Sequence, residues 1–159
     1  AELVGPEIYS AGGACYVGAQ LGPDGCVYSP PYNAGRVLRI DGARSAVDFI
    51  GEETKPLWQK WHSFALGADG HLYAPPCNAS QVMRVDCGTG AVDFVGPQFP
   101  EFPAGQQKWR TTIVAPDGCL YGVPCHERRV LRICCGPGAA ADVGLVGPEL
   151  NEDQSKFRG

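Results

Sequence analysis

A lysine followed by an aromatic residue recurs in the sequence, at Lys60-Trp61, Lys108-Trp109 and Lys156-Phe157. A cation beside an aromatic ring can hold a ligand through cation–π attraction. The alternative is packing, in which the ring fills the space between neighbouring elements while the lysine stem carries its ammonium to the surface. Packing is favoured, because a ligand site rarely needs the same residues in every copy of a motif. Four residues remain candidate ligand-binding residues: Lys60, Trp61, Lys108 and Trp109.

The three histidines share no repeat position, so they do not form a common constellation. His62 follows Trp61 and is the one candidate for a ligand-facing role, although a packed or surface role is favoured. The sequence contains no Gly-x-Ser-x-Gly elbow, phosphate-binding loop or Cys-x-x-Cys pair. It therefore predicts no catalytic, cofactor-binding or metal-ligating residue and no cofactor.

Eight cysteines raise the question of disulfides. If strands fold into a hairpin about Glu127, Cys119 lies opposite Cys135 or Cys134, and the pair can form a disulfide in an oxidising compartment. Cys77 and Cys87 fall at opposite ends of one strand, about 17 Å apart, and cannot bond. Buried free thiols explain most of the cysteines equally well, so the compartment stays open, with a lean towards export or an organelle lumen.

Composition excludes some partners. The 159-residue chain is 44% hydrophobic and carries a formal charge of −4 with 13 Lys and Arg. It is long enough to bury a core, but it lacks the clustered positive charge that nucleic acid or an anionic membrane surface requires. No apolar run approaches the ~20 residues of a bilayer-spanning helix, so neither nucleic acid nor membrane insertion is expected.

A repeat organises the whole chain. Asp24, Asp69 and Asp117 each begin an Asp-Gly pair, at spacings of 45 and 48 residues. Further matches follow in the same order, which makes the period specific. The matching segments are Val37–Asp41, Val82–Asp86 and Val130–Cys134, then Val47–Gly51, Val92–Gly96 and Val143–Gly147.

Each repeat predicts four short strands and no helix. In the second copy the strands are expected at about Trp61–Leu66, His71–Ala74, Val82–Asp86 and Ala91–Val95, separated by turn sequences. This pattern predicts an all-β fold of about three four-stranded antiparallel sheets, each one blade of a β-propeller. The blades are expected at approximately 6–51, 52–96 and 97–147, with 1–5 and 148–159 belonging to flanking blades. Ring closure usually needs four to eight blades, so further blades are expected from other protein chains, from more of the same chain, or from a homodimer.

One arginine recurs in the third strand of each copy, at Arg39, Arg84 and Arg132. These side chains could form a basic stripe. The favoured interpretation pairs each with an acid of the fourth strand, such as Asp48 or Asp93. In the third copy Gly144 holds that position and Asp142 lies nearby.

The pattern Asp-Gly-x-hydrophobic-Tyr, Asn, Val-Leu-Arg-Ile-Asp resembles the β-propeller repeats of the broad NHL, YVTN and lactonase-like group. It is also similar to propeller-like repeat proteins of single-celled algae. The resemblance covers roughly residues 3 to 158, without the Trp-Asp signature of WD40 blades or the paired glycines of kelch blades. It implies architecture more than function, because propellers host binding proteins and enzymes alike.

The expected function is a non-catalytic scaffold or protein-binding module, an accessory subunit or fragment of a larger assembly. Two alternatives stay open: a lactonase-like hydrolase with its site in other blades, and a propeller that binds glycans or small molecules. A lactonase-like propeller binds its metal with inward acidic and amide side chains. The inner strands of these repeats carry Val17-Gly18, His62-Ser63 and Thr111-Thr112, so metal-dependent hydrolysis within the three blades is disfavoured.

Overall fold

A computed structural model describes residues 5–8, 13–102 and 105–150, which form twelve strands and no helix. The strands make three four-stranded antiparallel sheets, each in simple chain order. Blade 1 contains β1 (Gln20–Leu21), β2 (Val27–Ser29), β3 (Val37–Asp41) and β4 (Ala46–Ile50). Blade 2 contains β5 (Ala65–Leu66), β6 (Leu72–Ala74), β7 (Val82–Val85) and β8 (Val92–Val95). Blade 3 contains β9 (Trp109–Val114), β10 (Leu120–Pro124), β11 (Val130–Cys134) and β12 (Asp142–Val146).

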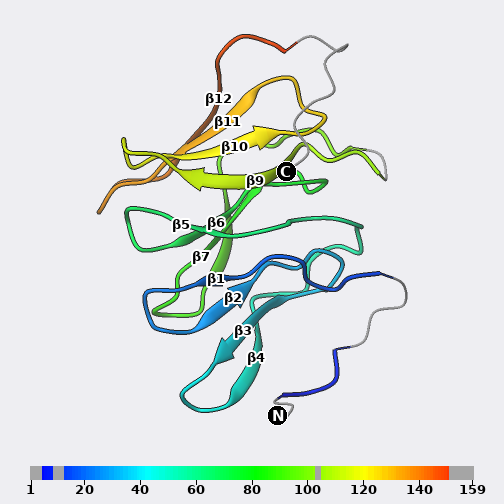
Figure 1. The fold of residues 1–159 in the computed structure, drawn as a ribbon, viewed down its shortest axis with the longest axis vertical. Coiled ribbons are helices and arrows are strands. Elements are labelled where there is room, and N and C mark those ends of the chain that lie inside the picture. Colours follow the sequence, from blue (N-terminus) through cyan, green and yellow to red (C-terminus); the bar gives the residue numbers. More distant parts are fainter. Residues whose placement is uncertain (1–4, 9–12, 103–104, 151–159) are drawn as a thin grey trace.

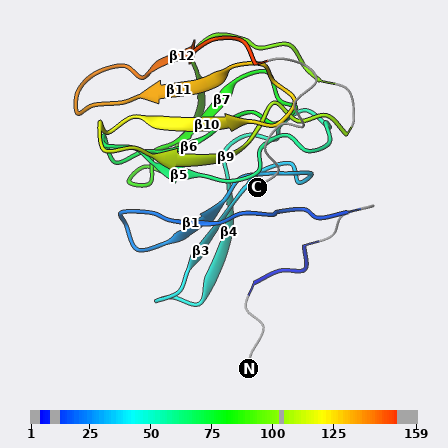
Figure 2. The same ribbon diagram turned by 45° about the horizontal axis from the view of Figure 1, so that its top comes forward.

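The three sheets stack on one another, with blade 2 between its neighbours (Figure 1). A second view of the same ribbon shows the same order, with the first strands β1, β5 and β9 following one another along the stack (Figure 2). Each sheet lies inside one of the three residue ranges given above, although the exact blade boundaries remain a prediction. Of the predicted flanking segments 1–5 and 148–159, residues 1–4 and 151–159 lie outside the described residues, Lys156-Phe157 among them.

The Asp-Gly turns explain why the first two strands of each blade pair. Gly25, Gly70 and Gly118 have φ values of +81°, +85° and +80°, a conformation that favours glycine. The preceding aspartate accepts the amide of the residue after each glycine at 3.2, 3.2 and 3.0 Å. Side chain and backbone therefore hold the same turn in all three copies.

The first strand of blade 2 is shorter than expected. β5 covers only Ala65–Leu66, and Trp61 pairs with Pro76 through an isolated bridge. Proline cannot donate to a ladder, so Pro75-Pro76 ends β6 at Ala74. Blade 3 has Val123 in place of the first proline, and there the pairing of β9 with β10 continues to Pro124.

Two apolar cores lie on opposite faces of blade 2. The first joins blades 1 and 2 around Tyr28, Leu72 and Met83, and the second joins blades 2 and 3 around Tyr73, Trp109 and Ile133. Because successive side chains of a strand face opposite ways, Leu72 and Tyr73 serve different cores. Blade 2 therefore buries both of its faces against repeats of its own sequence.

A glycine at the end of each fourth strand lets the next blade approach. A Cβ atom on Gly51 would lie 2.8 Å from Cβ of Val92, and one on Gly96 would lie 2.5 Å from Cβ of Val143. Gly147 occupies the same repeat position with the same left-handed backbone. A Cβ atom on Gly147 would have no described atom within 4 Å. The outer face of blade 3 is therefore open within the described part of the chain.

Candidate functional site

The two tryptophans proposed as ligand contacts are packing residues in this fold. Trp61 and Trp109 are 4% and 0% exposed, and their indole nitrogens donate to the carbonyls of Gln81 and Arg129. The ring of Trp109 also packs edge-on against Phe99, with 5.0 Å between centroids. Trp61 lies in the apolar core that joins blades 1 and 2, and Trp109 in the core that joins blades 2 and 3, which agrees with rings that fill the space between neighbouring blades.

The lysines do not reach the surface, contrary to the sequence-based expectation. Lys60 and Lys108 are 2% and 0% exposed. The Lys108 ammonium donates to the carbonyls of Asn78 and Pro100 and lies 5.1 Å from the ring centroid of Phe102. Burial lowers the pKa of each lysine to about 8. The expectation failed because the ammonium groups donate to backbone carbonyls, whose positions cannot be predicted from a pattern of side chains.

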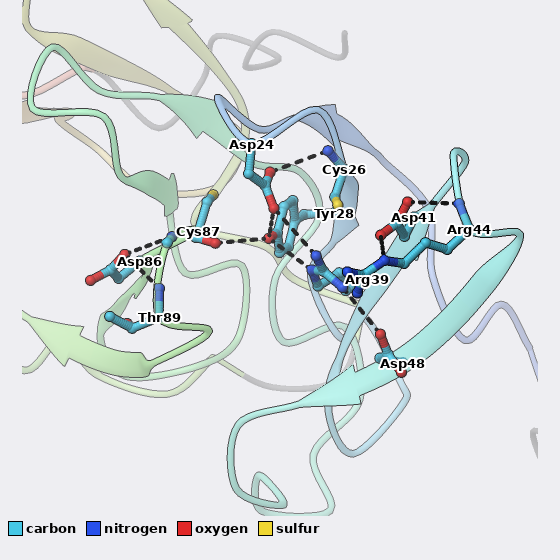
Figure 3. Close-up of polar contacts among 11 residues, drawn as sticks. Asp24, Cys26, Tyr28, Arg39, Asp41, Arg44, Asp48, Asp86, Cys87 and Thr89 are labelled. Carbon is cyan, nitrogen blue, oxygen red and sulfur yellow. Dashed lines mark hydrogen bonds and ion pairs between the residues drawn. The ribbon is translucent and has the colours of Figure 1, made fainter.

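The recurring Asp, Tyr and Arg residues form a structural network. In blade 1 the Tyr28 hydroxyl bonds Asp24 at 2.9 Å and accepts a bond from Arg39 at 3.2 Å (Figure 3). Arg39 also pairs with Asp48 on the neighbouring strand at 3.1 Å (Figure 3). Equivalent pairs join Arg84 to Asp93, and Arg132 to Asp142 at 3.1 Å, so the predicted arginine pairing is confirmed and the basic stripe is excluded.

The charged side chains of this network pair with one another, as Arg39 does with Asp24 and Asp48. Burial alone would raise the pKa of Asp24, but the Tyr28 hydroxyl, the Cys26 amide and Arg39 together lower it. The hydroxyls of Tyr28 and Tyr73 are buried, and burial raises their pKa values. These residues repeat because each blade needs them for its own geometry, which removes them from the candidate site.

A different set of polar side chains gathers where the first strands of neighbouring blades meet. The rim cluster, as we name it, consists of Tyr32, Gln59, His62, Gln107 and Arg110. The amide of Gln107 donates to the Tyr32 hydroxyl at 2.9 Å, and the Tyr32 ring meets the His62 ring edge-on at 5.8 Å. The cluster thus joins side chains from all three blades.

Close backbone contacts hold the rim cluster together. The amide of Gly18 donates to the His62 carbonyl at 3.0 Å, and the Ser63 hydroxyl donates to the Arg110 carbonyl at 3.4 Å. A Cβ atom on Gly18 would come within 2.8 Å of the His62 carbonyl oxygen, so glycine permits this approach. The first strands therefore present a fixed polar surface.

Several polar atoms of the rim cluster have no partner among the described residues. These buried atoms are Gln59 Oε1, His62 Nδ1 and Arg110 Nε. Burial lowers the pKa of His62, and the nearby positive charge of Arg110 lowers it further, which favours the neutral imidazole. Burial raises the pKa of Tyr32, while its bond from Gln107 opposes the shift. Since buried polar atoms are normally hydrogen-bonded, these three atoms are an exception within the described residues.

Of the residues predicted to bind a ligand, only His62 belongs to the rim cluster. The prediction missed Tyr32, Gln59, Gln107 and Arg110. One signal was available: Val17, His62 and Arg110 hold equivalent repeat positions but differ in chemistry. A position that changes within an otherwise regular framework is free of the packing constraint that keeps its neighbours alike.

The structure contains a disulfide between Cys119 and Cys134, with a Cα–Cα distance of 4.3 Å. This corrects the pairing of Cys119 with Cys135 and selects the other alternative. The register pairs Leu120 with Ile133, so the next pair outward is Cys119 with Cys134. Cys135 turns towards blade 2 instead, where a Cβ atom on Gly67 would lie 2.5 Å from its sulfur. Cys77 and Cys87 are both free.

Among the described residues, no group of three or more His, Cys, Asp or Glu is placed to hold a metal ion. The same part of the chain has no helix with the length and apolarity needed to cross a membrane.

No family model and no curated protein matches the sequence. Solved structures of similar fold include virginiamycin B lyase from Staphylococcus aureus with quinupristin, at 16% identity and a TM-score of 0.64, covering 86% of this chain and 42% of that one. A Bacteroides fragilis protein described as a 6-phosphogluconolactonase has 19% identity and a TM-score of 0.58, with 84% and 39% covered. Kuenenia stuttgartiensis hydrazine synthase has 18% identity and a TM-score of 0.52, with 89% and 39% covered.

The chain thus spans about two fifths of the length of each of these structures. At such identities the likeness concerns the fold, and it agrees with the repeat, the four-stranded sheets and their stacking. The chain therefore folds as three β-propeller blades, which make up part of a ring.

Proposed function

We propose that the chain is a non-catalytic β-propeller binding module whose rim cluster binds a small polyhydroxylated carboxylate. The single observation that carries the proposal is the group of unpartnered buried atoms on Gln59, His62 and Arg110. These atoms are themselves enclosed, but all three side chains are half-buried, so a ligand that carries both charge and hydroxyl groups would bond their outer polar atoms. A small number of convergent polar groups fixes the orientation of a small ligand in its site.

The charge of the rim cluster supports a carboxylate in particular. Arg110 forms no ion pair with any described residue, whereas Arg39, Arg84 and Arg132 each pair with an aspartate. A guanidinium binds a carboxylate through two parallel hydrogen bonds, and Gln59 and Gln107 can bond hydroxyls on either side.

Titration with D-gluconate, followed by calorimetry and by amide NMR shifts, tests this proposal. We expect binding that Arg110→Gln weakens at least tenfold. Arg44→Gln is the matched control, because Arg44 is exposed at the far turn and loses the same charge. Absence of gluconate binding, or an equal loss in both variants, would overturn the proposal. Turnover of D-glucono-δ-lactone by the wild-type chain would replace it with the hydrolase alternative.

A second part of the proposal concerns assembly: the chain is an accessory part of a larger ring, joined to further blades. Its support is the open face of blade 3. Gly51 and Gly96 each lie against a valine of the next blade, whereas Gly147 has no such contact among the described residues. Ile113 and Val114 are also exposed on blade 3. Sedimentation across a concentration range tests the homodimer form, since a monomer at all concentrations would leave only further blades or another chain as the partner.

A further inference from the structure

Each joint between two blades places a glycine of the earlier blade beside a cysteine of the later one. A Cβ atom on Gly22 of blade 1 would lie 3.0 Å from the Cys87 sulfur of blade 2. One on Gly67 of blade 2 would lie 2.5 Å from the Cys135 sulfur of blade 3. The two glycines hold one repeat position and the two cysteines another, so both joints use the same fit of a small residue to a larger one.

The two outer faces of the stack carry the reverse exchange of sizes. In blade 3 the glycine of the joint is replaced by Ala115. In blade 1 the cysteine is replaced by Gly42, and a Cβ atom on Gly42 would have no described atom within 4 Å. The larger residue on blade 3 thus matches the smaller one on blade 1. Blade 2 lies between these faces in one chain (Figure 1), so Ala115 can meet Gly42 of a second copy.

The apolar residues of the same two faces are less buried than their repeat equivalents. Val27 and Ile40 of blade 1 are half-buried, and so are Tyr121 and Val130 of blade 3. The equivalents in the inner joints are 0–1% exposed: Leu72, Val85, Leu120 and Ile133 for the blade 1 pair, and Tyr28, Val37, Tyr73 and Val82 for the blade 3 pair. Packing the outer faces together would bury the residues that the inner joints already bury.

A segment of the chain itself shows what fits the outer face of blade 1. A Cβ atom on Gly5 would lie 2.6 Å from Cβ of Val47. The glycines that follow β4 and β8 make the same approach to the equivalent valine of the next blade. Residues 3–7 and 145–149 both read Leu-Val-Gly-Pro-Glu. The place on blade 1 that holds Gly5 therefore also suits Gly147 of a second copy.

We propose that blade 3 of one copy docks on blade 1 of a second copy, with Gly147 taking the place of the second copy's Gly5 against Val47. The inference rests on the assembly part of the proposed function and names the partner as a second copy. Two copies of three blades close a ring of six, within the usual range of four to eight. Residues 5–8 compete with the partner for blade 1, so this contact weakens self-association.

The first test releases residues 5–8 and follows the full chain by sedimentation over a range of concentrations. Gly5→Val overpacks against Val47, so we expect self-association about tenfold tighter than in the wild type. Gly90→Val is the matched control, because Gly90 has the same left-handed backbone and a Cβ atom there would have no described atom within 4 Å. A monomer at all concentrations in the wild type and in Gly5→Val, or equal association in Gly5→Val and Gly90→Val, would overturn the inference.

The second test blocks the joint without touching residues 5–8. Gly42→Phe fills the space that Ala115 of the other copy needs, so self-association should fall about tenfold or more while the single chain keeps its fold. Gly136→Phe is the matched control, because Gly136 is equally unobstructed and follows Cys135, which faces blade 2. Equal association in these two variants would contradict the docking surface.

Hydrogen exchange separates this inference from the assembly proposal on which it rests. A monomer in which β9 to β11 exchange faster than β6 and β7 would exclude the second copy and leave the open face of blade 3 to further blades or another chain. A monomer with uniform protection would overturn both.

Discussion

At the scale of single residues, the aspartate of each Asp-Gly turn joins the amide that follows the turn to the tyrosine hydroxyl of the second strand. Asp69 accepts the His71 amide on one oxygen and the Tyr73 hydroxyl on the other, at 3.2 and 2.7 Å. Burial would raise its pKa, but these two bonds and the nearby His71 lower it. The carboxylate therefore stabilises the fold only while it is charged.

Replacing Asp69 with asparagine tests this role, because an amide keeps one acceptor and loses the other. We expect Asp69→Asn to lower the free energy of unfolding at pH 7 by about 1–3 kcal/mol, the usual cost of a hydrogen bond to a charged group. Since the folded pKa lies below the unfolded value near 3.9, the wild-type advantage should persist above pH 4 and shrink as the pH falls below it. Urea titrations at pH 7 and pH 3 measure the difference.

Asp117→Asn is the matched control. Asp117 makes the same two bonds, to Cys119 and Tyr121, but lies on the exposed face of blade 3. Its replacement should cost less than that of Asp69. An equal cost, or a loss at Asp69 that does not depend on pH, would contradict the assigned role.

The disulfide is a second contribution from individual residues. Cys119 and Cys134 are 15 residues apart, and closing a loop of this length removes about 3 kcal/mol of unfolded-state entropy. We expect reduction, or the pair Cys119→Ser and Cys134→Ser, to lower the free energy of unfolding by about this amount. Cys135→Ser should leave the reductant dependence intact. Unfolding curves with and without dithiothreitol that coincide would disprove the pairing.

At the scale of elements, each blade depends on how closely the next one approaches. Gly96 combines a φ of +78° with a contact that leaves no room for a methyl group beside Val143, whereas Gly147 has a φ of +77° and no described neighbour. The two glycines share one backbone strain and differ in one contact. They form an internal control for the joint between blades.

We expect Gly96→Ala to destabilise the chain by about 1–3 kcal/mol of overpacking on top of the left-handed strain, and Gly147→Ala by the strain alone. Paired urea unfolding curves measure the difference. Equal losses at the two positions would mean that the joint between β8 and β12 contributes little to stability.

The strands also show how far sequence reasoning reaches. Turn chemistry and alternation predicted the third and fourth strands of blade 2 to within a residue, because local residues decide them. The first strand was predicted too long, since its pairing depends on prolines at the far end of β6. The pairing of Cys119 with Cys135 was wrong by one residue, because choosing the residue at which a hairpin turns does not fix the register of its strands. The rim cluster was missed except for His62, because its residues come from three blades and share no motif.

At the scale of the whole molecule, stability should be highest in the middle of the stack. Blade 2 packs against a neighbour on both faces, and Leu72, Tyr73, Met83 and Val85 are all fully buried. In blade 3 Tyr121 is partly exposed, although its equivalents Tyr28 and Tyr73 are 0% exposed. In repeat proteins each unit gains stability mainly from its neighbours, so a unit with one open face opens more easily.

Hydrogen exchange followed by NMR measures this gradient directly. We expect the amides of β6 and β7 to exchange most slowly and those of β9 to β11 to exchange faster, in dilute solution where the chain is monomeric. Raising the protein concentration should leave this order unchanged if the open face of blade 3 takes further blades or another chain. If β9 to β11 became as protected as β6 and β7 at high concentration, a second copy would be covering that face, and the homodimer form of the assembly would be favoured. Uniform protection at all concentrations would contradict the open face itself, because a sheet lacking a neighbour cannot hold its amides as firmly as one enclosed on both sides.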